Sequence, residues 1–272
     1  MTHSSASLAR RAPASRTSGL PALIQASLLE KGFSLDSDAS VGLAVSWCAT
    51  FGHADVLSQI LEASRNDLLL WQQLRLAAAI LAASRSGQDE CVEIILPHCG
   101  ASFEHSPAAS HALLGAIAHG HRRCAQILLP WTNASDDNWR ALVLAARHGH
   151  AGILEDLMAV ADMSRCGRLS MSSAIEHGQE ACALLLIPCV DLASNSFEIL
   201  ASAIARGHVG ILFAIVSAIP NFQAIDFFEP WIDRARRNGC GGSAELLLSL
   251  QEGLLLSSLA PRSPATGSPK RI

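Results

Sequence analysis

Histidine and cysteine are the residues of this 272-residue chain whose types and spacing could form a metal site or a catalytic site, because both bind metal ions and take part in nucleophilic catalysis. Two rows of histidines flank successive glycines. The first row precedes its glycines and the second follows them: His119, His148 and His177, then His53, His121, His150 and His208. Neighbouring packed helices lie about 10 Å apart, whereas zinc–nitrogen bonds are about 2.0–2.1 Å long. We therefore interpret these residues as hydrogen-bonding turn histidines and predict no metal and no other cofactor.

The cysteines offer a second chemistry, that of a thiolate nucleophile activated by a nearby base. We expect Cys166 and Cys240 to be the exposed thiols. Neither has a histidine partner set by the sequence, so a Cys/His enzyme is only the weaker alternative, and we predict no catalytic residue. Cys91, Cys124 and Cys182 all stand four residues after a glycine, where other segments carry aliphatic side chains, which predicts buried free thiols.

The histidines fall into rows because the chain repeats, most clearly at Ala141–Met158. Four residues before each repeat glycine stands a small side chain, and apolar residues stand seven before it and eight and nine after it. This pattern predicts a short helix, a left-handed turn at the glycine and a second helix, and hairpins of this size bury their apolar sides only by stacking. Seven glycines, spaced by 35, 33, 29, 29, 29 and 32 residues, mark the copies: Gly52, Gly87, Gly120, Gly149, Gly178, Gly207 and Gly239.

This repeating pattern of glycine, small and apolar positions, called the repeat frame below, resembles the ankyrin repeat. The signature of that family, TPLHxAAxxGH, leads into a second helix with paired leucines. The best matches are LAARHGH, AIAHGH, AIARGH and CATFGH, and the resemblance covers about Leu20 to Leu259, as seven degenerate repeats after an N-terminal half-repeat at Pro21–Asp36. It implies an all-α dominated fold, an ankyrin-like α-solenoid of stacked helical hairpins. Three spacings of 29 fall short of the family's usual 33 residues, which predicts shortened or absent β-hairpin fingers.

The chain divides into three parts. Residues 1–18 form a basic segment rich in Ser, Ala and Arg, residues 19–260 the repeat solenoid, and residues 261–272 a disordered C-terminal tail. The first segment contains no acid, so it suits either a disordered tail, which we favour, or a cleaved mitochondrial or plastid presequence. Because no secretory signal is apparent, we expect a cytoplasmic protein, with the nucleus or an organelle as the alternative.

Charge narrows the choice of partner. The net charge is −4, and six basic residues lie in the acid-free ends, which leaves the intervening body at −10 and argues against nucleic acid. Val209–Ile225 has no charged residue, but Pro220-Asn221 and Gln223 interrupt it and the repeat pattern explains its apolar face, so we expect no membrane span. We also expect a monomer. Two lysines against eighteen arginines suggest a further alternative, a substrate adaptor of a ubiquitin ligase.

The resemblance implies a protein-binding scaffold or adaptor without catalytic activity. In ankyrin-like stacks the concave face is formed by the fingers and the first helices, which places recognition here at positions five, two and one before each glycine. These positions vary between copies, and their arginines suggest an acidic segment in the partner. The predicted partner-binding residues are Trp47, Phe51, Arg85, His119, Arg147, His148, His177, Arg206 and Arg237.

Overall fold

The computed structural model describes residues 26, 28–33, 38–63, 71–132, 138–219 and 228–259. The predicted tails, 1–18 and 261–272, lie outside these residues. Helices are the regular elements of the described ranges, which contain no strand, and the all-α prediction is confirmed. The chain packs as two compact units, unit 1 (residues 1–145 and 159–161) and unit 2 (residues 146–158 and 162–272). The single domain over residues 19–260 stays a prediction.

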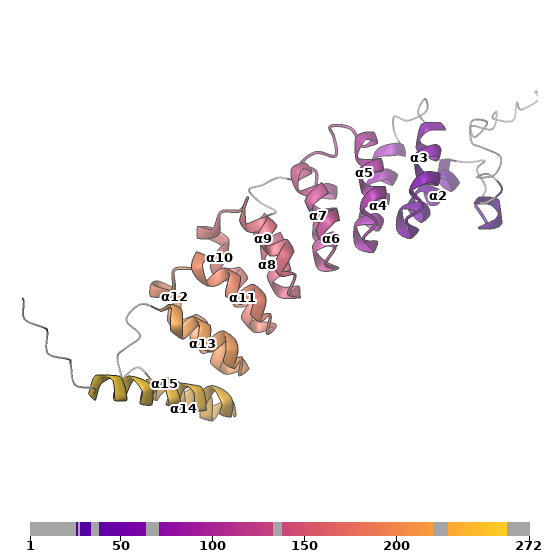
Figure 1. Cartoon of the computed structure of the whole chain (residues 1–272). Helices are drawn as coiled ribbons and strands as arrows, with labels where there is room; N and C mark the ends of the chain where they lie inside the picture. The colour runs from indigo at the N-terminus through magenta and orange to yellow at the C-terminus, as the bar shows by residue number, and fades with distance from the viewer. Residues whose placement is uncertain are drawn as a thin grey trace, which may run out of the picture. The chain divides into compact units, whose positions relative to one another are not determined.

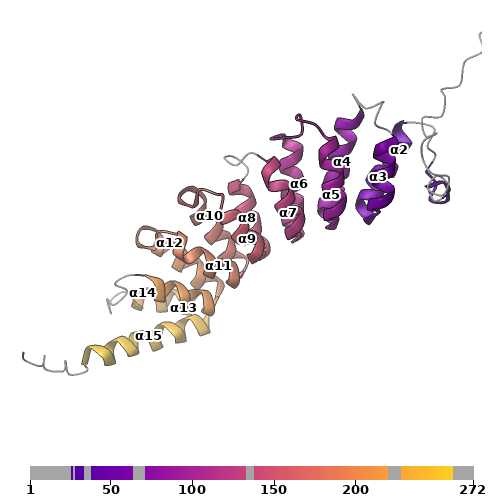
Figure 2. The same cartoon turned by 45° about the horizontal axis from the view of Figure 1, so that its top comes forward.

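Unit 1 is built of helical hairpins in two layers (Figure 1). First helices pack on first helices, α2 on α4 and α4 on α6, and second helices likewise, α3 on α5 and α5 on α7. Figure 2 shows α4 with α5 and α6 with α7 as successive pairs. The elements are α2 (Asp38–Phe51), α3 (Ala54–Ala63), α4 (Trp71–Ser86), α5 (Asp89–Ile95), η1 (Leu96–His98), α6 (Pro107–Ala118), α7 (Arg122–Leu128), η2 (Leu129–Trp131) and α8 (Asn138–His148) as far as residue 145.

Unit 2 repeats this plan. Its first helices pack as α10 on α12 and α12 on α14, and its second helices as α9, α11, α13 and α15 in order. After the end of α8 it contains α9 (Ala151–Met158), α10 (Met163–Glu176), α11 (Glu180–Leu186), η3 (Ile187–Cys189), α12 (Leu192–Arg206), α13 (Val209–Ala218), α14 (Phe228–Arg237) and α15 (Gly241–Leu259).

Burial follows the repeat frame. The side chain seven before each glycine is at most 4% exposed and the one eight after it at most 2%. Because a helix of the same hairpin or the next one approaches at the fourth position before the glycine, only a small side chain fits there. These residues are all 0% exposed: Cys48, Ala83, Ala116, Ala145, Ala174, Ala203 and Ala235.

The repeat glycines end the first helices. All seven have φ between 68° and 78°, a left-handed conformation that costs a residue with a Cβ free energy, so the predicted helix stop is confirmed. The amide that follows the glycine donates to the carbonyl four residues before it, from His121 to Ala116 at 2.9 Å and from Gln179 to Ala174 at 2.8 Å. This hydrogen bond closes the turn and directs the chain into the second helix.

In several copies, the side chain that follows the glycine rests on the glycine of the preceding copy. Gln88 lies on Gly52 in unit 1, and Gln179 lies on Gly149 in unit 2. The side-chain Nε2 of Gln179 also donates to the backbone carbonyl of Arg147 at 3.3 Å. Although Gln179 stands at the N-cap of α11, it makes no side-chain cap bond there, because its side chain is engaged by the neighbouring copy. The glycine therefore serves the stacking of copies as well as the turn.

Prolines shape the ends of the second helices. α5, α7 and α11 each stop two residues before a proline, and the proline sits within a short 3₁₀ turn, as expected from its missing amide hydrogen. After Pro188 the sequence predicts a tight surface loop at Cys189–Ser196, and this prediction is wrong, because α12 already begins at Leu192. The 3₁₀ turn η3 accommodates Pro188, so only Val190 and Asp191 are needed to start the next helix.

The N-terminal half-repeat is described over part of its length. Its sequence places Leu28-Leu29 at the paired-leucine position of the second helix. Leu28 is buried and Leu29 is 60% exposed, so only one of the two leucines packs inward. Gly32 has a φ of 82°, and the amide of Phe33 donates to the carbonyl of Leu28 at 3.0 Å. The sequence predicts that Lys31-Gly32 ends this helix, and the positive φ and the hydrogen bond confirm it.

Leu142→Ala tests the frame, because Leu142 is 0% exposed and its truncation opens a cavity in a packed core. We expect the free energy of unfolding to fall by about 2–5 kcal/mol, measured by urea denaturation. Leu157→Ala, at a position 2% exposed, is expected to behave likewise. Exposed Glu155→Ala is the control and should stay within about 0.5 kcal/mol of the parent. Parental midpoints for both leucine variants would contradict the frame.

Gly149→Ala and Gly239→Ala separate backbone strain from steric contact. Both glycines have positive φ, +78° and +72°, so each alanine is expected to cost about 1–2 kcal/mol through strain. A Cβ at Gly239 meets nothing within 4 Å, whereas one at Gly149 lies 2.7 Å from Cδ of Gln179. Urea denaturation should therefore show the larger loss for Gly149→Ala.

The helical Gly253, with open space around it, supplies the control for both variants. Gly253→Ala is expected to be neutral or to stabilise by up to about 1 kcal/mol, because alanine favours helix. A neutral Gly149→Ala would mean that this glycine neither caps α8 nor seats Gln179.

Candidate functional site

The predicted partner-binding residues lie at the C-terminal ends of the first helices. Each is exposed except Trp47, which is half-buried. We call this set the first-helix surface. Unit 1 carries Trp47, Phe51, Arg85 and His119, and unit 2 carries Arg147, His148, His177, Arg206 and Arg237.

The cations of this surface also have a local structural role. Arg85 lies in the last turn of α4, Arg147 in that of α8 and Arg206 in that of α12. A cation there complements the partial negative charge of the helix C-terminus, which contributes about 0.3–1 kcal/mol at exposed positions. Helix stability alone therefore favours a basic residue at these positions, a reason that the repeat frame by itself did not reveal.

Trp47 belongs to an aromatic cluster at the first repeat. Its ring stacks on His53 with centroids 4.7 Å apart, and it meets Phe51 at 5.2 Å and Phe33 at 5.8 Å in tilted contacts. Phe51 remains 60% exposed. Trp47 therefore mainly supports the cluster, and Phe51 presents the larger apolar contact to solvent.

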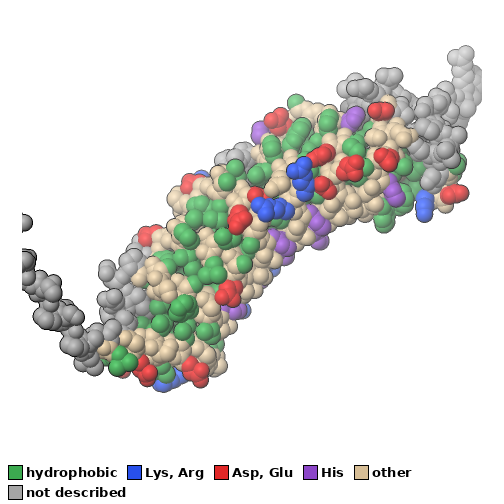
Figure 3. Space-filling model, in the orientation of Figure 1, with side chains coloured by type: hydrophobic (Ala, Val, Ile, Leu, Met, Phe, Trp, Pro, Cys, Tyr) green, Lys and Arg blue, Asp and Glu red, His purple; other side chains and the backbone are tan. Residues whose placement is uncertain are grey.

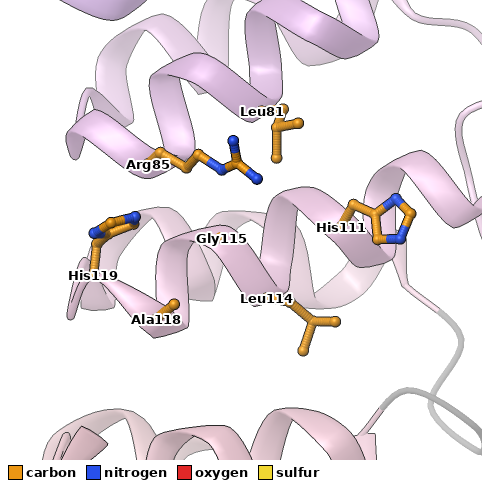
Figure 4. A pocket seen from close by; sticks show the side chains of 7 residues that line it. All are labelled: Leu81, Arg85, His111, Leu114, Gly115, Ala118 and His119. Atoms are coloured by element: carbon orange, nitrogen blue, oxygen red, sulfur yellow. The ribbon is translucent and has the colours of Figure 1, made fainter.

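Arg85 and His119 line one pocket of about 480 Å³ between α4 and α6. Figure 4 shows the Arg85 side chain lying along the side of α6 that carries Gly115, with Leu81 above and Leu114 and Ala118 along α6. A Cβ on Gly115 would stand 3.2 Å from Cγ of Arg85, so the glycine leaves room for the arginine stem. Among the residues that the structure describes, no carboxylate lines the pocket.

Three lining residues of this pocket were not predicted: Leu81, His111 and Leu114. They stand six or nine positions before a repeat glycine, about one helical turn before the positions that the resemblance supplied. The 3.6-residue period could have identified them, because it puts residues four apart on one face. Conversely, Gly115 and Ser173, five before their glycines, are largely buried, because that position turns toward the neighbouring first helix.

In unit 2, the last repeat presents a shallower pocket of about 310 Å³ lined by Arg234, Arg237 and Asn238. The Nε of Arg237 donates to the carbonyl of Asp233 at 3.3 Å, which holds that side chain against its own helix. Arg237 is thus less free to meet a partner than its exposure suggests.

Histidines of the two rows bind backbone carbonyls of different helices. In the row after the glycines, Nε2 of His121 donates to the carbonyl of Arg85 at 3.0 Å, the same reach that Gln179 makes in unit 2. In the row before the glycines, Nδ1 of His177 donates to the carbonyl of Ser173 at 3.0 Å. The hydrogen-bonding interpretation therefore holds for these two, whereas Nε2 of His150 is buried without a partner among the described residues.

Cys166 is buried, so its predicted exposure is wrong. Its side chain is 2% exposed, its thiol donates to the carbonyl of Asp162 at 2.8 Å, and burial raises its pKa. The reason is that α10 begins at Met163, with Asp162 as its N-cap, and so extends well before the frame positions. Cys240 is half-buried, and Cys189, which was not singled out, is exposed.

The remaining cysteines are buried free thiols, as predicted for Cys91, Cys124 and Cys182. Burial raises the pKa of Cys91 and of Cys124 to about 11, and that of Cys182 in the same direction. A raised pKa lowers the thiolate fraction at neutral pH, so these side chains are poor nucleophiles and act as small apolar residues.

Neither a metal centre nor a membrane segment is formed by the residues that the structure describes. Within these ranges, no three side chains of His, Cys, Asp or Glu lie close enough to share a metal ion. No helix of the described parts is both long and apolar enough to cross a bilayer.

Unit 2 exposes apolar side chains on its second helices (Figure 3). Leu184 on α11 is 45% exposed, and Val209 and Phe213 on α13 are 38% and 51% exposed. α11 and α13 pack on one another, so these residues form a second surface that a protein partner could cover.

Comparisons with known proteins agree with this architecture. Ankyrin repeats, in three copies, match residues 79–165, which include the turns at Gly87, Gly120 and Gly149. The crystal structure of the human ASB11 ankyrin repeat domain is similar with a TM-score of 0.52 at 17% sequence identity, over 65% of this chain and 84% of that chain. Direct comparison with curated proteins finds no match. The fold is the ankyrin-repeat fold, and residues 79–165 match the ankyrin-repeat family.

Thiol labelling of the native protein is expected to separate the cysteines by accessibility. Exposed Cys189 should react first and half-buried Cys240 next. Cys48, Cys99 and the other buried thiols should react only on unfolding, because burial hides them and raises the pKa to about 11 for Cys48 and about 12 for Cys99. Mass spectrometry of peptides after timed labelling measures the order, with urea-unfolded protein as the control. Fast labelling of Cys166 would contradict its burial.

Proposed function

We propose that this protein is a non-enzymatic scaffold or adaptor that binds another protein through the first-helix surface. The observation that carries the proposal is the contrast within each repeat, where the frame positions are buried and nearly constant while the helix ends are exposed and varied. Ankyrin repeats are generally protein-interaction modules, which supports the same function. Phe51 and the arginines of the surface are residue types that often dominate protein interfaces.

Charge supports an acidic segment as the element of the partner that is recognised. Among the described residues, no carboxylate pairs with Arg85, Arg147 or Arg206. Elsewhere, Arg123 pairs with Glu93 at 3.2 Å and Arg168 with Glu198 at 2.9 Å. Cations that have no ion-pair partner among the described residues attract carboxylates of a binding partner and raise the association rate.

The absence of catalysis is part of the proposal. The buried cysteines are poor nucleophiles, because burial raises the pKa of their thiols. The turn histidines His121 and His177 use a ring nitrogen to bind backbone carbonyls. These observations support a structural use for both residue types, and the predicted lack of a cofactor rests on the same residues.

The compartment and the finer role stay predictions. We keep the cytoplasm as the expected location and a monomer as the expected state, with a cleaved organelle presequence at residues 1–18 as the alternative. N-terminal sequencing of the mature protein distinguishes these. The ubiquitin-ligase adaptor continues to rest on the scarcity of lysine alone.

The proposal is tested by purifying a partner with the tagged full chain, identifying it by mass spectrometry and measuring its affinity by calorimetry. Arg147→Ala and Arg206→Ala are expected to weaken binding by about tenfold or more each, because both arginines are exposed and make no ion pair with a described residue. Glu155→Ala, on the second helix α9, is the control and should leave the affinity unchanged.

A further variant tests whether the partner binds instead to the apolar surface of the second helices. Phe213→Ser removes the most exposed side chain of the apolar patch on α11 and α13. If Phe213→Ser weakens binding while both arginine variants bind normally, the partner occupies the second helices and the first-helix surface is excluded.

A further inference from the structure

The pocket between α4 and α6 combines one permanent cation with an apolar wall. Arg85, His111 and His119 supply the basic groups, and the apolar side is formed by Leu81, Leu114 and Ala118. Its volume of about 480 Å³ lies within the roughly 300–1,000 Å³ of ligand pockets. The lining therefore suits a ligand that carries an anionic group beside an aliphatic one.

Arg85 is placed for binding rather than for an internal ion pair. Its stem packs beside Gly115, where a Cβ would lie 3.2 Å from Cγ and 3.7 Å from Nε of Arg85. No described carboxylate pairs with its guanidinium. The backbone carbonyl of Arg85 accepts the hydrogen bond from His121, which anchors the end of α4 and leaves the side chain to the pocket.

We propose that this pocket binds a carboxylate side chain of a peptide segment, with an adjacent aliphatic residue of that segment packed on Leu81 and Leu114. The inference rests on the proposed protein-binding function and deepens it by naming the element that unit 1 recognises. A guanidinium forms two parallel hydrogen bonds to a carboxylate. One permanent cation balances one carboxylate charge, whereas a phosphate of nearly two charges fits less well in a protein whose body is net negative.

The test uses the isotope-labelled full chain and short peptides of known sequence. The probe has the core Leu-Glu-Glu-Leu, and its matched controls have the cores Leu-Gln-Gln-Leu, Ser-Glu-Glu-Ser and Leu-Gln-phosphoserine-Leu, the last without a carboxylate. Nuclear magnetic resonance titration should shift the Gly115 amide and the Nε–H of Arg85. The glutamine and serine controls should each bind about tenfold more weakly, because each removes one half of the recognition.

Three variants distinguish a loss of peptide binding from a loss of folding stability. Arg85→Gln should weaken binding of the probe about tenfold, and Arg123→Gln, an equal change of charge on α7, should leave it within about twofold. Gly115→Ala fills the space beside Arg85 and Leu81 but favours the helix, so it should weaken binding several-fold without lowering the melting temperature.

Each outcome decides the assignment. Equal binding of the Glu and Gln peptides, an Arg85→Gln variant that binds normally, or no binding of the probe overturns it. Tighter binding of the phosphoserine peptide that depends on Arg85 overturns the carboxylate and assigns a phosphate ligand instead. If the peptide tests exclude this pocket while Arg147→Ala and Arg206→Ala still weaken binding of the purified partner, the proposed function stands without this site.

Discussion

The left-handed glycine turn between the two helices of each copy is the constraint on which the rest of the structure depends. It sets the direction of the second helix, because the amide after the glycine closes on the carbonyl four residues before it. It also sets the stacking, because the next copy places a side chain directly on the glycine, as Gln88 does on Gly52 and His208 on Gly178. A Cβ at either glycine would oppose both the turn and the contact.

Because one turn sets both the direction of the second helix and the stacking of copies, only a few positions in each copy are restricted in residue type. The small residue four before the glycine lies at 0% exposure in every copy, and the apolar residues around it complete each core layer. The side chains one and two positions before the glycine are exposed or half-buried and take little part in that packing, so they are free to differ. The last turn of the first helix carries the partial negative charge of the helix end, which favours cations such as Arg85 and Arg206 at this edge. The C-terminal ends of the first helices are therefore both variable, because they lie outside the core, and often basic, because cations stabilise a helix end.

Some predictions failed where structure extends outside the repeat frame. Cys166 was expected to be exposed, yet α10 begins three residues before it, at Met163, and Cys166 is buried. The loop expected at Cys189–Ser196 failed in the same way, because a 3₁₀ turn around Pro188 allows α12 to start at Leu192. Helix starts depend on caps and on packing at the junctions, and these junctions differ from copy to copy.

The sequence by itself determined the helical hairpins, the glycine stops, the buried cysteines at Cys91, Cys124 and Cys182 and the exposed edge, because each follows from spacing along a single chain segment. Only the tertiary structure decided that Gly115 makes room for Arg85, that Leu81 and His111 share its pocket, and that Trp47 stacks on His53. The physical reason is that these contacts join side chains whose distance depends on how one helix is turned and shifted against another. Spacing along the chain gives the face of a helix but not the neighbour that it meets.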